Sequence, residues 1–435
     1  MALGGGTFTV QNKELPGAYM NFVSAASATP ALSDRGVVTM PLELDWGAEG
    51  EVFEVTNENF QENSREIFGY DYSHDKLKGL RDLFLNAQTL YAYRLNSGGK
   101  KASNEFATAR YPGVRGNALK IVVQANADDP AKYDVQTLLD TAVVDEQTVS
   151  APKELTDNKY VTWNSEAELT ATPGTPLSEG SNGEVQGEAH QAYLDKIEAY
   201  TYNVMGVAVT DDVTKSLYVT FCKRLRDEMG IKFQLVLHNK DADYYGVVNV
   251  KNKTLDKGWS EASLVYWTAG KEANCAVNRS VQNAVYDGEF TVDVALTQTQ
   301  LKQAIKDGEF TFHKVGSDIR VLEDINSMVT VSDTCGDIFK DNQTVRVIDQ
   351  IGNDIAVLFN TKYLGVVPND NAGRVSLWSD IVKHHEQLQE IRAIENFSDS
   401  DVVIGQGETK KSVVVSDAVT IVNAMGKLYM TVTVA

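Results

Sequence analysis

The sequence contains little of what several common classes of protein require. Its 435 residues include three cysteines, which are far apart and odd in number: Cys222, Cys275 and Cys335. This pattern argues against a disulfide framework and a zinc site, and it favours folding in a reducing cytoplasm. No stretch approaches the ~20 apolar residues that a membrane helix needs. Residues 1–6 have neither the basic nor the apolar region of a secretory signal, so we expect neither feature.

Positive charge is also scarce. The chain has 60 acidic and 40 basic residues and a formal net charge of −20, which would repel a phosphate backbone. We therefore expect no nucleic-acid partner. Residues 127–190 alone hold 13 carboxylates and three lysines, a net charge of −10. Such a segment favours solvation over packing and predicts an outer domain.

No set of residues indicates catalysis, a cofactor or a metal. The only histidine cluster is His384-His385, and neighbours on a helix point about 100° apart, which favours one surface and one packed histidine. The turn at Thr210–Asp212 has two acids and no glycine where a phosphate would bind. Gly405–Ser412 faintly resembles a phosphate loop, but its spacing favours a plain hairpin turn. We therefore assign no catalytic, cofactor-binding or metal residues.

What is present is ordinary globular composition, with 43% hydrophobic and 23% charged residues. The length suggests two to four domains. The clearest local unit is residues 203–237, where an apolar strand is followed by Asp211 or Asp212 as a helix cap. Cys222 lies on the apolar stripe of that helix, which begins with Val213, and a second apolar strand follows. This pattern predicts a βαβ crossover.

The expected fold class is α/β (α+β overall) and multidomain, with a mixed sheet core, an inserted β-rich domain and a C-terminal α+β domain with extended terminal arms. Further strands are expected at Val37–Leu42, Glu51–Val55, Thr89–Arg94, Tyr245–Val250, Asp401–Ile404, Ser412–Val415 and Lys427–Ala435. Helices are expected at 260–277, from Thr297 through Ile305, and over 378–391. Thr172–Pro176 is expected to be a turn.

These expectations give six segments along the chain. They are an N-terminal extended arm (1–20), the first part of the α/β core (21–97), the inserted β-rich outer domain (98–190), the second part of the core (191–360), a C-terminal inner domain (361–426) and a C-terminal arm strand (427–435).

Both ends of the chain are unusually apolar. Leu428, Met430, Val432 and Val434 form one row of an alternating strand, and Tyr429 belongs to the opposite row. Phe8 and Val10 lie in a similar strand behind a glycine-rich start. Each end is either an edge strand of its own domain or a strand that is added to a neighbouring subunit. The residues alone leave both interpretations open.

Several stretches in a fixed order resemble one known family. They are Leu15–Tyr19, Ala109–Asn117, Val265–Gly270 with Asn278–Ser280, Asp307–Phe310, Asp324–Asn326, Arg346–Asp349, Asn371–Arg374 and Ala424–Val432. The ordered set is similar to the contractile tail sheath proteins of PBSX-like prophages and of R-type bacteriocins, the phage-tail-like particles of Gram-positive bacteria.

The resemblance implies a structural protein without a cofactor, one that assembles with copies of itself into stacked helical hexameric rings around a tail tube. Terminal arms from neighbours would add strands to a sheet in the C-terminal domain. Contraction would drive the tube through a target cell envelope. Further implied partners are the tube protein, the baseplate and the tail terminator, with no direct membrane binding. Assembly in the bacterial cytoplasm and release by lysis would follow.

One basic surface is a candidate for contact with the tube. Arg374, Lys383, His384 and Arg392 lie on or beside the helix expected over 378–391, in a less acidic part of the chain. Two alternatives to the sheath hypothesis stay open. One is another self-assembling phage tail or capsid component, and the other is a cytosolic α/β enzyme that uses the crossover.

Overall fold

The computed structural model describes residues 32–434. Among the described residues the chain divides into two compact units, one formed by residues 34–353 with 421–434 and the other by residues 354–420 with Leu32 and Ser33. The strand expected at Phe8 and Val10 lies outside the described residues.

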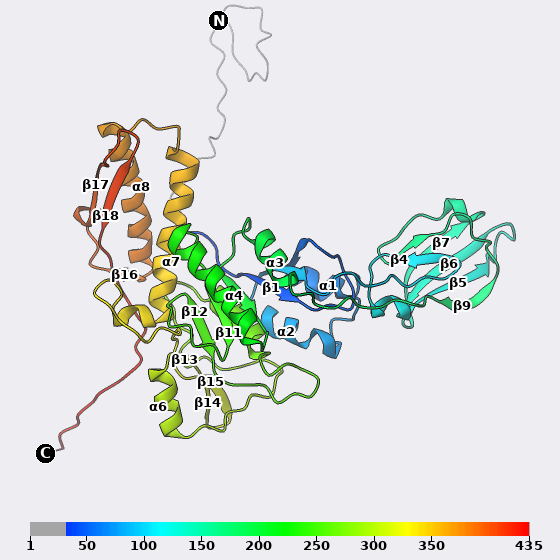
Figure 1. Cartoon of the computed structure of the whole chain (residues 1–435), viewed down its shortest axis with the longest axis horizontal. Helices are drawn as coiled ribbons and strands as arrows, with labels where there is room; N and C mark the ends of the chain where they lie inside the picture. The colour runs from blue at the N-terminus through cyan, green and yellow to red at the C-terminus, as the bar shows by residue number, and fades with distance from the viewer. Residues whose placement is uncertain (1–31, 435) are drawn as a thin grey trace, which may run out of the picture. The chain divides into compact units, whose positions relative to one another are not determined.

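A seven-stranded sheet forms the centre of the first unit (Figure 1). Its order is β13-β12-β11-β10-β1-β3-β2, and all neighbours are parallel except β2 and β3. The strands are β1 (Val37–Leu42), β2 (Val52–Thr56), β3 (Thr89–Arg94), β10 (Val204–Val207), β11 (Gln234–His238), β12 (Val247–Val250) and β13 (Glu309–Phe310). The expected mixed sheet is confirmed.

Helices cover both faces of this sheet because its strands are apolar on both faces. Helices α1 (Asn57–Phe68), α2 (Lys78–Phe84) and α5 (Leu264–Asn274) contribute to one core, and α3 (Ala189–Ile197) and α4 (Asp212–Lys223) contribute to the other. Within β10, Val204 belongs to the first core and Met205 to the second. At Gly206 an added Cβ would lie 2.9 Å from that of Ala269, so the small residues let α5 approach the sheet closely.

The predicted crossover is confirmed. β10 and β11 are parallel neighbours, and α4 joins them. The Asp211 side chain accepts a hydrogen bond from the Thr214 N–H (2.7 Å) and caps the helix. Cys222 is buried in the core, as expected, but Val213 is 79% exposed because it lies on the solvent side of the first turn.

The insertion between β3 and α3 is β-rich, as expected. It has a four-stranded antiparallel sheet in the order β7-β6-β5-β9 and a separate pair, β4 with β8. The strands are β4 (Ala107–Ala109), β5 (Leu119–Ala125), β6 (Tyr133–Leu139), β7 (Ala142–Val149), β8 (Val161–Trp163) and β9 (Thr172–Pro176). The expected turn at Thr172–Pro176 is wrong, because this segment is edge strand β9, where proline is tolerated.

The remaining elements of the first unit follow β12. Helix α6 (Gln298–Lys306) begins where expected, with a capping box of Thr297 and Gln300. A hairpin follows, formed by β14 (Phe312–Val315) and β15 (Asp318–Val321). Helix α7 (Asn342–Leu358) carries the chain into the second unit.

The second unit contains helix α8 (Asn371–Glu390), the hairpin of β17 (Val402–Gln406) and β18 (Val413–Asp417), and the short strands β16 (Ile394–Glu395) and β19 (Thr420–Ile421) near its end. α8 begins seven residues before the expected helix, because the Asp370 side chain accepts a hydrogen bond from Gly373 N–H (2.8 Å) and caps it there. The expected hairpin turn within 405–412 is confirmed.

Candidate functional site

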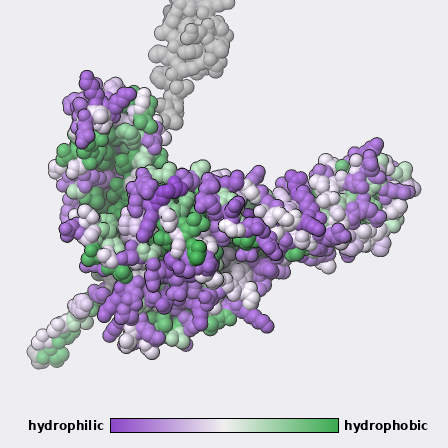
Figure 2. All heavy atoms as spheres, viewed as in Figure 1, coloured by the Kyte–Doolittle hydropathy of each residue, from purple (hydrophilic) through white to green (hydrophobic). Residues whose placement is uncertain are grey.

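The C-terminal segment is exposed and apolar. The expected strand over 427–435 is absent from the described part, residues 427–434. Five of its large side chains are 68–89% exposed, and Figure 2 shows hydrophobic green on the segment that ends at the C-terminus. They are Leu428, Tyr429, Met430, Val432 and Val434. A segment forms a β-strand only when its backbone hydrogen-bonds to a partner strand. This alternating apolar segment therefore requires such a partner.

The hairpin of β17 and β18 offers such partner edges. Within residues 32–434 these strands pair only with each other, so each has an edge with unpaired backbone groups. Val403 and Val414 on the hairpin are more than half exposed. An open two-stranded sheet with exposed valines is a suitable acceptor for an added strand.

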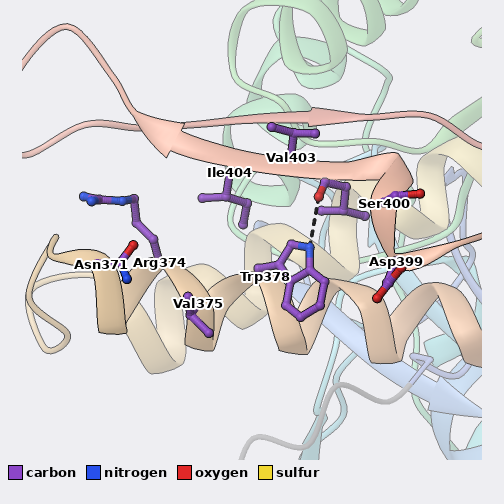
Figure 3. A pocket seen from close by; sticks show the side chains of 9 residues that line it. Asn371, Arg374, Val375, Trp378, Asp399, Ser400, Val403 and Ile404 are labelled. Carbon is purple, nitrogen blue, oxygen red and sulfur yellow. Dashed lines mark hydrogen bonds between the residues drawn. The ribbon is translucent and has the colours of Figure 1, made fainter.

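A groove of about 440 Å³ lies between α8 and β17 (Figure 3). Its apolar lining residues include Val375, Trp378, Val403 and Ile404, and its polar ones are Asn371, Arg374, Asp399 and Ser400. The Trp378 indole N–H donates a hydrogen bond to the Val402 carbonyl (2.9 Å) and so fixes the ring against β17. The groove can take apolar side chains beside the open strand edge.

Three of the four candidate tube-facing residues are accessible. Lys383 and Arg392 are exposed, and Arg374 is half-buried. The Arg374 guanidinium donates hydrogen bonds to the Asn369 carbonyl (3.1 Å) and Oδ1 (3.0 Å), which hold it at the start of α8. The fourth, His384, is 1% exposed. The candidate surface therefore consists of Arg374, Lys383 and Arg392.

His384 and His385 belong to a buried hydrogen-bonded chain. His384 Nε2 lies 3.0 Å from Asp354 Oδ2, and His385 Nε2 lies 2.8 Å from Asp417 Oδ2. The two Nδ1 atoms are 3.3 Å apart. The expected surface histidine is therefore wrong, since both rings are buried. Sequence reasoning missed the two carboxylates because they lie 30 and 32 residues away on other elements.

The alternatives based on small-molecule chemistry gain no support. Asp211 occupies the start of α4 with its own carboxylate, and Asp212 pairs with Lys240 at 2.8 Å. Among residues 32–434 no group of three or more His, Cys, Asp or Glu side chains could hold a metal ion. No helix of that same region is long and apolar enough to cross a membrane.

Four family models match consecutive parts of the chain. They describe the tail sheath protein Gp18 domain III N-terminal region (residues 35–95), the phage tail sheath protein beta-sandwich domain (97–182), the phage tail sheath protein central domain (183–327) and the phage tail sheath C-terminal domain (335–435).

Full-length relatives agree with these matches. The phage-like element PBSX protein XkdK of Bacillus subtilis (strain 168) is 31% identical, and the alignment covers 99% of this chain and 100% of XkdK. The crystal structure of the sheath tail protein from Desulfitobacterium hafniense is 34% identical, with a TM-score of 0.82 over 95% of this chain and 99% of that one.

Two structures of the anti-feeding prophage share the fold. They are the helical sheath in its contracted state and the sixfold-symmetrised baseplate, with TM-scores of 0.59 and 0.57 at 12% identity, each over 97% of this chain and 99% of that one. Four sheath-domain models and a full-length relative above 30% identity agree on one family. The chain belongs to the phage tail sheath protein family and is a subunit of a contractile tail sheath.

Proposed function

We propose that this subunit polymerises as stacked helical hexameric rings around a tail tube and contracts to drive the tube through a target cell envelope. Its partners are copies of itself, the tube protein, the baseplate and the tail terminator. Its role is structural and not enzymatic. Assembly takes place in the bacterial cytoplasm, and release follows lysis. The family supports the structural role, and the titles of the two anti-feeding prophage structures name a sheath and a baseplate.

The observation that carries the proposal is the unpaired, apolar C-terminal segment. We call residues 428–435 the C-terminal arm, and we propose that it adds a strand to the β17–β18 hairpin of a neighbouring subunit. Phe8 and Val10 lie on the corresponding N-terminal arm of this proposal. The exposed valines of the hairpin and the groove beside Trp378 support it as the acceptor.

For one arm, the free energy gained by burial and hydrogen bonding is close to the free energy lost when the arm is ordered. Burial of Leu428, Met430, Val432 and Val434 stabilises by about 6–12 kcal/mol, and about four net hydrogen bonds add about 2–6 kcal/mol. Ordering seven or eight residues costs about 7–16 kcal/mol. A free subunit therefore leaves its arm loose, whereas a lattice, in which many arms act at high effective concentration, favours the ordered strand.

Deleting residues 428–435 should leave a folded, soluble subunit and abolish polymerisation. Met430→Pro should act nearly as strongly, because proline removes a hydrogen-bond donor from the strand. Met430→Thr is the matched control, since it keeps that donor, and it should weaken polymerisation only modestly. Sedimentation measures polymerisation, and circular dichroism measures folding. Polymerisation by the truncated protein would show that the arm does not join subunits, and a failure to fold would place the segment in its own domain.

A further inference from the structure

The C-terminal arm leaves the folded body from a fixed point. Gln343, in the first turn of α7, hydrogen-bonds the backbone at both Val422 and Ala424. Its Nε2 donates to the Val422 carbonyl (3.0 Å), and its Oε1 accepts from the Ala424 N–H (2.9 Å). A side-chain amide has the same donor and acceptor as a backbone amide, so Gln343 holds this segment as a neighbouring strand would.

A second hydrogen bond fixes the residue between them. Asn423 Nδ2 donates to Thr344 Oγ1 at 3.0 Å. Three consecutive residues, 422–424, are therefore bound by two consecutive residues of one helical turn. We call residues 422–424 the arm root.

The helix side of this contact is rigid, whereas the arm is not held. Gln343 and Thr344 are each 1% exposed. Their turn of α7 is itself fixed, because the Asn342 N–H donates to the Asp324 carbonyl (2.9 Å) and the Thr344 N–H donates to Asp341 Oδ1 (3.1 Å). Farther along, the Lys427 ammonium lies 4.0 Å from the Glu323 carboxylate, and because this lysine is 70% exposed the ion pair stabilises little. From residue 428 to 434 the chain is exposed.

We propose that Gln343 and Thr344 are positioning residues that fix the arm root, so that each free subunit offers its arm from a set point and in a set direction. The inference rests on the proposed function of the arm. An eight-residue arm reaches at most about 29 Å, so the position of its root decides which neighbouring sheet it can meet. Release of the root would add about six flexible residues, which lowers the effective concentration of the arm at its acceptor.

Gln343→Leu tests the proposal, because leucine keeps the apolar bulk and removes both hydrogen bonds to the root. Water can replace them, since Val422 is half-buried and Ala424 is exposed. We expect the critical concentration for polymerisation to rise at least tenfold, since several more residues must be ordered each time an arm binds. We also expect faster hydrogen exchange of the Ala424 amide and unchanged exchange in the central sheet.

Gln234→Leu is the matched control. It makes the same substitution at a buried glutamine whose amide donates to Asn342 and not to the root. It should lower the thermal midpoint and leave the critical concentration unchanged. A folded Gln343→Leu variant that polymerises at the wild-type concentration would overturn the inference. An equal rise in critical concentration for Gln234→Leu would overturn it too.

Asn423→Ala tests the same contact from the side of the root, and it covers the case in which Gln343→Leu does not fold. Asn423 is exposed, so the substitution leaves the core intact. We expect a smaller rise in critical concentration, of about threefold, and an unchanged value would count against the anchor. If deletion of 428–435 leaves polymerisation intact, both proposals are wrong. If that deletion abolishes polymerisation while the root variants behave as wild type, only the anchor is wrong.

Discussion

Asp82 is a buried carboxylate whose protonation state affects the stability of the folded chain. Its Oδ2 accepts a hydrogen bond from the Tyr286 hydroxyl (2.6 Å), and its Oδ1 accepts one from the Glu289 N–H (2.7 Å). Burial nevertheless raises the pKa of Asp82 from 3.8 to about 6. The folded state therefore binds this proton more tightly than the unfolded state does.

The stability that Asp82 contributes should be present below about pH 4 and lost as the pH rises through about 6. The loss is about 3 kcal/mol. Asp82→Asn mimics the neutral acid and lacks this dependence. We therefore expect the free energy of unfolding of the wild type, relative to Asp82→Asn, to fall between pH 4 and pH 7 in denaturant titrations. A difference that is independent of pH would contradict the assignment.

Single residues were predictable where the signal is local. The cap at Asp211 and the buried Cys222 follow from neighbours within one helix, and both are confirmed. His384 was not predictable. An amphipathic pattern treats histidine as polar, and its partner Asp354 lies on another helix.

At the scale of elements, α7 shows which contacts escape sequence analysis. Charged residues of its first half are buried in ion pairs with the core. Arg226, in the turn of helix after α4, donates to both oxygens of Asp349 (2.6 and 2.7 Å), and Arg346 pairs with Glu272 and with Asp324 (2.6 Å). The apolar residues of α7 keep the helical period, but its buried charges pair with residues that are far away in the sequence, which no local pattern predicts.

The protonation states of Glu272 and Asp324 follow from burial and from their contacts with Arg346. Burial raises the pKa of Glu272 well above its usual value, and the nearby Asp324 adds to the rise. Burial would also raise the pKa of Asp324, but the Arg346 charge and hydrogen bond lower it. Asp324 is therefore the charged partner of Arg346, and Glu272 is the neutral one. Removing Arg346 alone would leave a buried charge without compensation.

Helix α8 carries the proposed contact with the tube. Lys383 and Arg392 are exposed, and their charges favour reversible polar contacts. Reversal of both, in Lys383→Glu with Arg392→Glu, should weaken co-sedimentation with purified tube at least tenfold and leave tube-free polymers intact. Lys302→Glu on α6 is the matched control and should bind as wild type. Unchanged tube binding by the double variant would show that this surface faces elsewhere.

At the scale of the whole molecule, the acidic segment has the character expected of an outer layer. None of the 13 carboxylates within residues 127–190 is buried. Packing so many charges against the tube or a neighbour would require their desolvation, which is costly. We therefore propose that this part of the β-rich domain faces away from the tube.

The fold class was predictable from the sequence because the apolar strands and the crossover are local patterns. The sequence pattern of the C-terminal segment predicts a strand but not the strand with which it pairs. Its pairing partner belongs to a neighbouring subunit in our account, so the single chain leaves Met430 and Val432 exposed. The root at Gln343 could not be foreseen, because it joins residues 79 and 81 positions apart through side-chain hydrogen bonds.

Electron microscopy of the purified full-length protein tests the central claim most directly, namely that this chain assembles with itself into a sheath. The account predicts hollow tubes or stacked sixfold rings, with the acidic β-rich domain on the outer surface. Small separate particles would contradict it if they persist at protein concentrations far above the concentration that the protein reaches in a phage lysate.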